Sequence, residues 1–209
     1  MLTVGPLQEN CFLVRASADA THVVMVDPGE EAQRLVAAVQ EAGATLDAIL
    51  LTHCHFDHIG AVAPVARATG AEVWCPEIET DLLTDLMTYM PYPEFGPYES
   101  YDPEHTVRGG EVLELAGLEI DVLFTPGHSP GHVTYVPRGA NAIFSGDVLF
   151  QSSIGRTDLP GGDHPTLMAS IAGLLERLED DTVVHPGHMG LTTLGAERRT
   201  NPFLADLVS

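Results

Sequence analysis

Lysine is absent from this chain of 209 residues, and all nine of its Lys/Arg-type cations are arginines. Without lysine the chain can form no Schiff base, and it lacks the cation with which P-loop sites hold phosphate. Its 30 acidic residues give a formal net charge of -21, which repels nucleic acid and anionic membrane surfaces. We therefore expect neither as a partner, and we predict a small-molecule substrate.

Cysteine is scarce, and long apolar runs are missing. The three cysteines, Cys11, Cys54 and Cys75, form no C-x-x-C pair, which argues against a disulfide framework and against a cysteine-ligated zinc. No run approaches the roughly 18 apolar residues of a membrane-spanning helix, and the N-terminus lacks the basic and apolar regions of a secretion signal. We expect a soluble cytoplasmic protein with a single domain over residues 1–209, whose oligomeric state the sequence does not specify.

Short apolar runs alternate with segments of helical periodicity along most of the chain. A helical pattern over residues 30–42 stops at Gly43, and another over 61–69 stops at Gly70, because glycine commonly terminates helices. Asp163 is a favourable N-cap for a helix that continues to residue 178. This alternation predicts an α/β fold in which helices cover sheets. We predict strands over residues 11–14, 22–26, 48–51, 111–115, 118–124, 133–136, 142–144 and 182–184, and a closing helix over 193–199.

One segment differs in composition from the rest. Residues 82–101 contain four of the five tyrosines of the chain together with three prolines and two methionines, and most of these lie in residues 87–101. A loop this long and aromatic is commonly functional or disordered. We interpret it as a lid or wall of a substrate cleft, with a loop that covers a sheet edge as the alternative.

Three histidines and an aspartate occur within six consecutive positions directly after the apolar run 48–51. His53, His55, Asp57 and His58 thus follow a predicted buried strand, which delivers them into one loop. Neutral imidazole and carboxylate groups suit Zn²⁺, Fe and Mn²⁺. The sequence therefore predicts a tightly held divalent metal at this loop.

Three further segments also place a metal-ligand side chain just after an apolar run. His128, Asp147 and His188 each follow within four residues of the end of a predicted strand, and loops at strand ends are common places for functional sites. Seven ligands exceed the four of a tetrahedral zinc, but they suffice for two cations that share one carboxylate and one water. A hydroxide held in this way is a nucleophile at neutral pH, so the ligand set favours hydrolysis.

These residues resemble the metallo-β-lactamase superfamily, whose fold is a four-layer αββα sandwich. The resemblance rests on T-H-C-H-F-D-H at residues 52–58, followed by a lone histidine, a Gly-Asp pair and a late Gly-His pair, and it spans essentially the whole chain. Finer matches resemble the short bacterial glyoxalase II-like hydrolases, which cleave hydroxyacyl-glutathione thioesters such as S-lactoylglutathione. These matches lie in residues 145–150, 154–163, 186–188, 192–195 and 201–204.

The resemblance implies how the ligands divide between two divalent cations, expected to be Zn²⁺ with Fe or Mn²⁺ as alternatives. Asp147 would bridge the two cations. The hydroxide held between them would attack the thioester carbonyl, Asp57 would orient that hydroxide, and a thiolate would leave. The implied ligand sets are His53, His55 and His128 for the first cation, and Asp57, His58 and His188 for the second.

Two other residues are candidates for supporting roles. Asp27 either orients a ligand histidine from behind or caps the turn at Asp-Pro-Gly. Longer glyoxalase II enzymes bind glutathione through a C-terminal helical region with basic and tyrosine residues, and this recognition mode is not expected in a chain that ends soon after Phe203 and has no lysine. Arg156 is then the candidate to bind a substrate carboxylate, with a structural salt bridge as the alternative.

Two histidines lie close in sequence to the assigned ligands. His132 comes four residues after His128, and His185 comes three before His188, so each could substitute for its neighbour. Because both border predicted strands, we favour His128 and His188 as the ligands. Cys54 points away from the flanking histidines if the loop is extended, so we interpret it as a packing residue.

The ligand set also leaves other activities open. A persulfide dioxygenase would hold one iron with His53, His55, His128 and Asp147, whereas a lactone or other ester hydrolase would use the whole set. A nuclease typically needs a basic face, a β-lactamase is typically exported, and a non-catalytic metal-binding protein does not need every ligand position filled. We therefore predict a metal-dependent thioester hydrolase, with the dioxygenase and the other ester hydrolases as alternatives.

Overall fold

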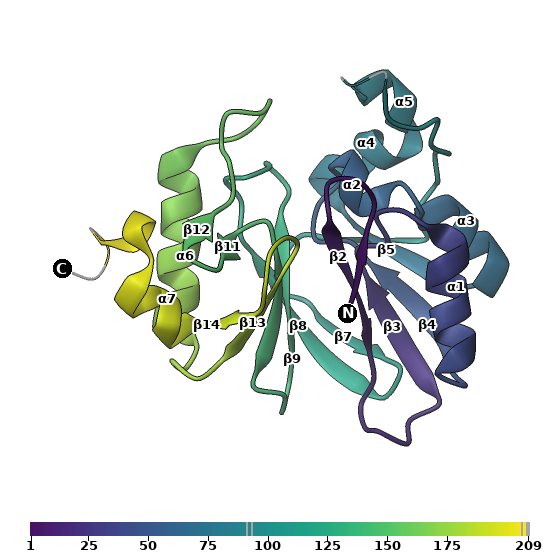
Figure 1. Cartoon of the computed structure of the whole chain (residues 1–209), viewed down its shortest axis with the longest axis horizontal. Helices are drawn as coiled ribbons and strands as arrows, with labels where there is room; N and C mark the ends of the chain where they lie inside the picture. The colour runs from purple at the N-terminus through teal and green to yellow at the C-terminus, as the bar shows by residue number, and fades with distance from the viewer. Residues whose placement is uncertain (91, 93, 206, 208–209) are drawn as a thin grey trace.

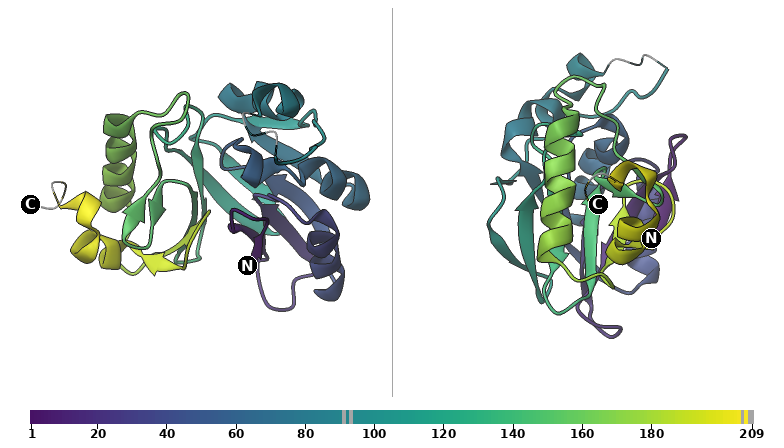
Figure 2. Two further views of the ribbon diagram at one scale, coloured as in Figure 1. Left: turned by 45° about the horizontal axis from the view of Figure 1, so that its top comes forward. Right: turned by 90° about the vertical axis from the view of Figure 1, so that its left-hand side faces the viewer.

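The computed structural model describes residues 1–90, 92, 94–205 and 207. Two six-stranded sheets lie face to face, and helices cover the outer face of each, so the chain forms an αββα sandwich (Figure 1). The predicted fold class is therefore confirmed. The N-terminal half supplies one sheet with its helices and the C-terminal half supplies the other, and the two halves stand side by side when the molecule is turned (Figure 2).

The first sheet has the strand order β1-β2-β3-β4-β5-β6. It is mixed, because β1, β2 and β3 pair antiparallel, whereas β3 to β6 pair parallel and are connected by helical segments. Its strands are β1 (Leu2–Val4), β2 (Glu9–Val14), β3 (His22–Val26), β4 (Thr45–Leu50), β5 (Glu72–Pro76) and β6 (His105–Val107). The helices of this half are α1 (Ala32–Glu41), α2 (Phe56–Ile59), α3 (Val62–Thr69), η1 (Glu77–Glu79), α4 (Thr80–Thr84) and α5 (Leu86–Tyr89).

Alternating side chains of the first sheet build a separate core on each of its faces. In β3, Val23 and Met25 belong to the outer core, which includes residues of α1 and α3, whereas Val24 and Val26 belong to the core between the sheets. All four are buried. Burial on both faces explains why β3 and β4 are almost continuously apolar in sequence.

The second sheet has the strand order β14-β13-β10-β9-β8-β7, in which β10 and β13 pair parallel. Its outer face packs against α6, whose Leu167, Ile171 and Leu174 form a third core with Ile143 and Val184 of the sheet. The elements of this half are β7 (Val112–Leu115), β8 (Leu118–Phe124), β9 (Val133–Pro137), β10 (Ala142–Gly146), β11 (Leu149–Phe150), β12 (Ser153–Ile154), α6 (His164–Arg177), β13 (Val183–Pro186), β14 (Thr192–Thr193), α7 (Leu194–Thr200) and η2 (Pro202–Leu204).

Two predicted helix boundaries are confirmed. The Asp163 side chain accepts a hydrogen bond of 2.9 Å from the Thr166 backbone N–H and caps α6. Gly70 ends α3 in the left-handed conformation with φ of 76°, which glycine adopts without steric cost. None of the helices in the described part of the chain has the length and apolar character needed to span a bilayer.

Several elements of the structure were not predicted, among them helix α2 and the short pair of strands β11 and β12. Strands β1, β5 and β6 were not predicted, because two of them have only three residues and β5 contains a glutamate and a proline. Strand β14 follows the strand predicted to be the last one. The segment predicted as a loop over residues 82–101 includes part of α4 and the whole of α5, although residues 91 and 93 lie outside the described residues.

Candidate metal centre

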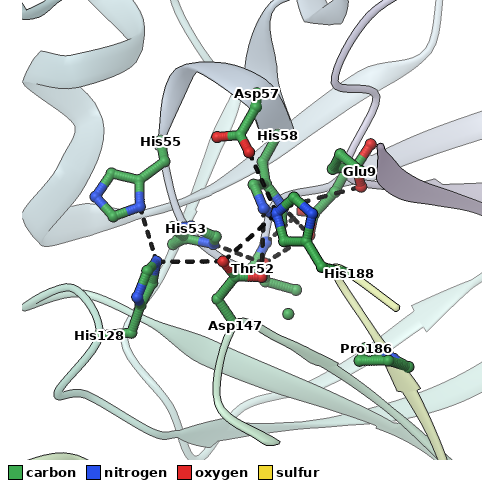
Figure 3. Close-up of polar contacts among 12 residues, drawn as sticks. Glu9, Thr52, His53, His55, Asp57, His58, His128, Asp147, Pro186 and His188 are labelled. Carbon is green, nitrogen blue, oxygen red and sulfur yellow. Dashed lines mark hydrogen bonds and ion pairs between the residues drawn. The ribbon is translucent and has the colours of Figure 1, made fainter. Parts of the chain in front are cut away.

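The seven predicted ligand residues converge at one edge of the sandwich, where loops from both sheets meet (Figure 3). The histidine loop and α2 follow β4, and the other three ligand residues follow β8, β10 and β13. Strands anchored in the cores thus fix the starting point of every loop. Residues that are more than a hundred positions apart in sequence come together as a result.

The first group consists of His53, His55 and His128. One ring nitrogen from each lies within 4.8 Å of the other two. The closest pair is His55 Nδ1 and His128 Nε2, which are 2.8 Å apart. His53 is fully buried and His128 nearly so, whereas His55 is only partly buried and lies at the open side of the group.

The second group consists of Asp57, His58 and His188, again with ligand atoms within 4.8 Å of one another. His188 Nε2 lies 3.2 Å from Asp57 Oδ2. Asp57 and His58 are on α2, whereas His188 follows β13 of the other sheet. Both groups therefore draw on both sheets.

Asp147 lies between the two groups. Its Oδ2 is 3.4 Å from His128 Nε2 of the first group, and its Oδ1 is 3.4 Å from His58 Nε2 of the second. A third contact of 3.7 Å joins Oδ2 to His188 Nε2. Asp147 thus contacts ligands of both groups at 3.4 Å, and an oxygen of Asp27 lies within 4.8 Å of His53 and of His58.

The donor set fits a pair of divalent cations. His53 Nε2, His58 Nε2 and Asp147 Oδ1 are buried and have no hydrogen-bond partner within the described residues. Burying a polar atom unpaired costs roughly 1–3 kcal/mol, and a cation coordinated by these atoms removes that cost. The histidine and aspartate clusters are therefore consistent with a dinuclear centre.

The two groups differ in their electrostatics. Burial, reinforced by neighbouring imidazoles, lowers the pKa of His53 well below its usual value. Burial and then His128 lower the pKa of His55 to about 4. Burial also acts to lower the pKa of His58, but the charges of Asp147 and Asp57 outweigh it and raise that pKa. His53 and His55 therefore offer neutral lone pairs, whereas the carboxylates around His58 favour positive charge there.

Asp27 orients His58 from behind. Its Oδ2 lies 3.0 Å from His58 Nδ1, and its two oxygens also accept hydrogen bonds from the backbone N–H and hydroxyl of Thr52, at 2.7 and 2.6 Å. The imidazole is therefore turned with Nε2 toward Asp147. Gly29 lets the Asp27 turn pack directly on α2, because a Cβ at Gly29 would lie 1.8 Å from the Asp57 carbonyl oxygen.

Arg156 contacts the site through its backbone. Its carbonyl oxygen is 2.8 Å from His128 Nδ1, which fixes Nδ1 as the donor and directs Nε2 into the site. Its guanidinium pairs with Asp158 through two contacts of 2.7 Å at the surface. The predicted role of Arg156 in substrate binding stays a prediction.

Neither of the other two candidate histidines belongs to a ligand group in the described site, although His132 stacks on His53 with ring centroids 4.9 Å apart. Both ring nitrogens of His132 have partners, since Nε2 accepts from the Asp147 backbone N–H at 3.1 Å and Nδ1 lies 3.1 Å from Thr125 Oγ1. His185 packs against Phe12 and Phe144 between the sheets, with ring centroids 5.3 and 4.9 Å away.

A family model described as the metallo-beta-lactamase superfamily matches residues 4–188 of the chain. The chain belongs to this superfamily. Hydroxyacylglutathione hydrolase GloC of Haemophilus influenzae is 37% identical over 207 residues, which cover 98% of this chain and 96% of GloC. Two solved structures each match 97% of this chain. The BLEG-1 B3 metallo-beta-lactamase has 40% sequence identity and a TM-score of 0.90, and 97% of its own chain is covered. TTHA1623 in a di-iron-bound form has 42% sequence identity and a TM-score of 0.86, and 98% of its own chain is covered.

Two buried carboxylates beside this metallo-beta-lactamase-type centre were not found by sequence reasoning. Glu9 Oε1 lies 3.9 Å from His58 Nδ1, and burial raises the pKa of Glu9 well above its usual value. Glu79 accepts hydrogen bonds from the loops of His53 and His128 on the opposite side. Glu9 begins a strand and Glu79 ends a short 3-10 turn, and neither lies in a motif that marks it.

Proposed function

We propose that this protein is a metal-dependent hydrolase of thioesters, with hydroxyacyl-thiol conjugates such as S-lactoylglutathione as its substrates. The observation that carries the proposal is the pair of ligand groups joined by Asp147. Kinship with GloC, which is named for hydroxyacylglutathione hydrolysis, supports the substrate class. We further propose that the reaction takes place in the cytoplasm.

We propose that the two ligand groups bind two Zn²⁺ ions, one in each group. His53, His55 and His128 would hold one, and Asp57, His58 and His188 the other, with Asp147 shared. When bound, two such cations polarise a carbonyl oxygen and lower the pKa of a water molecule to roughly 7. A thiol is a tolerable leaving group because its pKa is around 8.5, so no dedicated general acid is needed.

Asp57 has a double role in this proposal. Its Oδ2 faces His188 Nε2 at 3.2 Å, and the pKa of this carboxyl, which burial acts to raise, is held low chiefly by the charge of His58. An ionised carboxylate at this place can accept a hydrogen bond from the attacking water and orient it toward the substrate carbonyl.

An aromatic cluster lies beside the metal centre and could form a wall of the cleft that binds the acyl or thiol part of the substrate. Phe56 lies in sequence between the ligands His55 and Asp57, and its ring centroid is 5.0 Å from that of Phe95 and 5.7 Å from that of Tyr92. Tyr98 stacks on Phe56 at 6.2 Å and hydrogen-bonds through its hydroxyl to Glu30. The described part of segment 87–101 thus packs next to the ligands, as the lid or wall hypothesis requires.

The test is a substrate panel run on protein reloaded with one metal at a time. The protein is stripped with a chelator, reloaded with Zn²⁺, Fe²⁺ or Mn²⁺, analysed for bound metal, and assayed with S-lactoylglutathione, a lactone, glutathione persulfide and a β-lactam. We expect two metals per chain and thiol release from the thioester, abolished in Asp147→Ala. A single iron with sulfite formation from the persulfide would contradict the proposal.

β-Lactam hydrolysis is the second candidate, because BLEG-1, named as a B3 metallo-beta-lactamase, is 40% identical with a TM-score of 0.90. The panel separates the two activities directly. Faster turnover of the β-lactam than of the thioester, by the same two-metal protein, would transfer the assignment to that reaction.

A further inference from the structure

One buried carboxylate connects the two loops that carry the first group of ligands. Glu79 is 1% exposed and ends η1, just after β5. Its Oε2 accepts a hydrogen bond of 2.6 Å from the Cys54 backbone N–H. Its Oε1 accepts from the Ser129 hydroxyl at 2.5 Å and from the Gly131 backbone N–H at 2.8 Å.

Two of these three donors are direct sequence neighbours of the predicted ligands of the first group. Cys54 stands between His53 and His55, and Ser129 directly follows His128. A single side chain therefore spans the loop after β4 of one sheet and the loop after β8 of the other. None of the hydrogen bonds of Glu79 reaches Asp57, His58 or His188 in the described site, so its contacts belong to the first group alone.

The chemistry of the three donors requires an acceptor without N–H groups. Two backbone N–H groups and one hydroxyl point at the two oxygens, and an ionised carboxylate accepts at both. A glutamine would present its NH₂ group to the donors of one loop and lose that connection. Gly131 also makes room for Glu79, because a Cβ at Gly131 would lie 2.7 Å from Glu79 Cγ.

Glu197 provides a comparison elsewhere in the molecule. It is also 1% exposed and also accepts from three donors, the Ser152 backbone N–H at 2.8 Å, the Thr192 hydroxyl at 2.5 Å and the Asn201 side-chain amide at 2.9 Å. None of these donors is adjacent in sequence to a predicted ligand. A substitution at Glu197 is therefore a matched control for one at Glu79, because the two side chains are equally buried and accept equally many hydrogen bonds but only Glu79 bonds to residues next to the ligands.

We propose that Glu79 is the positioning residue of the first cation position, holding His53, His55 and His128 at their mutual spacing. The inference rests on the two-cation part of the proposed function but not on the thioester substrate. Because Glu79 contacts loops and not ligands, its removal loosens the geometry of the first position and leaves the second intact. Residues that orient metal ligands typically contribute about 10- to 100-fold to metal affinity.

The experiment is Co²⁺ titration of the chelator-stripped full chain, followed by absorbance and calorimetry, in two backgrounds. His188→Ala leaves only the first position complete, and His55→Ala leaves only the second. We expect Glu79→Gln to weaken Co²⁺ binding about 10- to 100-fold in the His188→Ala background and less than about twofold in the His55→Ala background. Glu197→Gln should change neither affinity.

Ser129→Ala keeps the test decisive if Glu79→Gln does not fold. It removes one of the two donors on the His128 side, and we expect a smaller loss of affinity, about threefold to tenfold, confined to the first position. Equal losses at both positions, or no loss at either, would overturn the inference. Two bound Co²⁺ ions without thioester turnover would contradict only the proposed substrate, whereas a wild-type chain that binds no Co²⁺ would overturn both proposals.

Discussion

The two ligand groups lie side by side around Asp147, yet they are supported by different interactions. The first is made of histidines alone. Glu79 accepts hydrogen bonds from its loops, and the Arg156 carbonyl accepts one from the His128 ring. The second contains Asp57, and carboxylates also stand behind it, with Asp27 3.0 Å and Glu9 3.9 Å from His58 Nδ1. Hydrogen bonds that fix the loops are therefore the main support of the first group, whereas negative charge around His58 is the main support of the second.

Removal of Asp147 is expected to have the largest effect, because its carboxylate contacts ligands of both groups. Asp147→Ala should lose both cations and lower kcat/KM by at least about 100-fold, more than a change behind the ligands. Metal analysis after dialysis and thiol release measure these outcomes. Retention of two cations with near-normal activity would show that the groups are independent of Asp147.

Asp27→Asn tests the role of charge in the second position. The asparagine keeps the size of the side chain but removes the charge that faces His58 Nδ1, so the affinity of the second position should fall about 10- to 100-fold. The first position should lose less affinity, since Asp27 is linked to its ligand His53 through the Thr52 hydroxyl, which lies 3.1 Å from His53 Nδ1. Metal titrations in the His55→Ala and His188→Ala backgrounds separate the two positions, and equal losses would erase the distinction between them.

Removal of the cations should lower the stability of the fold. Cations at about 1000 times their dissociation constant stabilise the folded chain by roughly 4 kcal/mol, and a chelator removes that contribution. We expect Tm to fall by several degrees in calorimetry with excess EDTA and to recover on addition of Zn²⁺. The drop should be smaller for His188→Ala and for His55→Ala, and an unchanged Tm in the wild type would argue against tight binding.

Arg156→Met is expected to have the smallest effect. Its guanidinium is exposed and already paired with Asp158, and exposed ion pairs contribute about 0.2–1 kcal/mol. KM for an anionic thioester should rise less than about fivefold, with kcat unchanged, because the backbone carbonyl that orients His128 is retained. A large fall in kcat measured by steady-state kinetics would instead place the side chain in the reaction itself.

The candidate ligands could be predicted from the sequence because each one lies in a recognisable local pattern. An apolar run fixes the strand, and glycine and proline mark the turn that follows, so His128, Asp147 and His188 could be placed at strand ends without coordinates. The groups implied by the family resemblance coincide with two of the three clusters of possible ligands in the described residues, and the third cluster, Asp27, His53 and His58, was not predicted. Strand β3 and the N-cap at Asp163 were predictable for the same reason of strong local pattern.

Features that depend on contacts between distant segments could not be predicted. Glu79 accepts a hydrogen bond from Gly131, which lies 52 positions away in sequence, and the residues around neither one form a pattern that predicts this contact. The edge strand β6 is only three residues long, so it exists through its pairing with β5 and not through its own periodicity. Local sequence pattern thus indicates the candidate ligand residues, whereas the residues that support them are brought into place by contacts between distant segments.

Anomalous X-ray diffraction at the zinc edge, from crystals of the Zn²⁺-loaded protein, tests the central claim most directly. We predict two peaks, roughly 3.5–4 Å apart as in other two-metal sites, one among His53, His55 and His128 and the other among Asp57, His58 and His188, with Asp147 between them. A single peak, or two peaks that Asp147 does not join, would contradict the account.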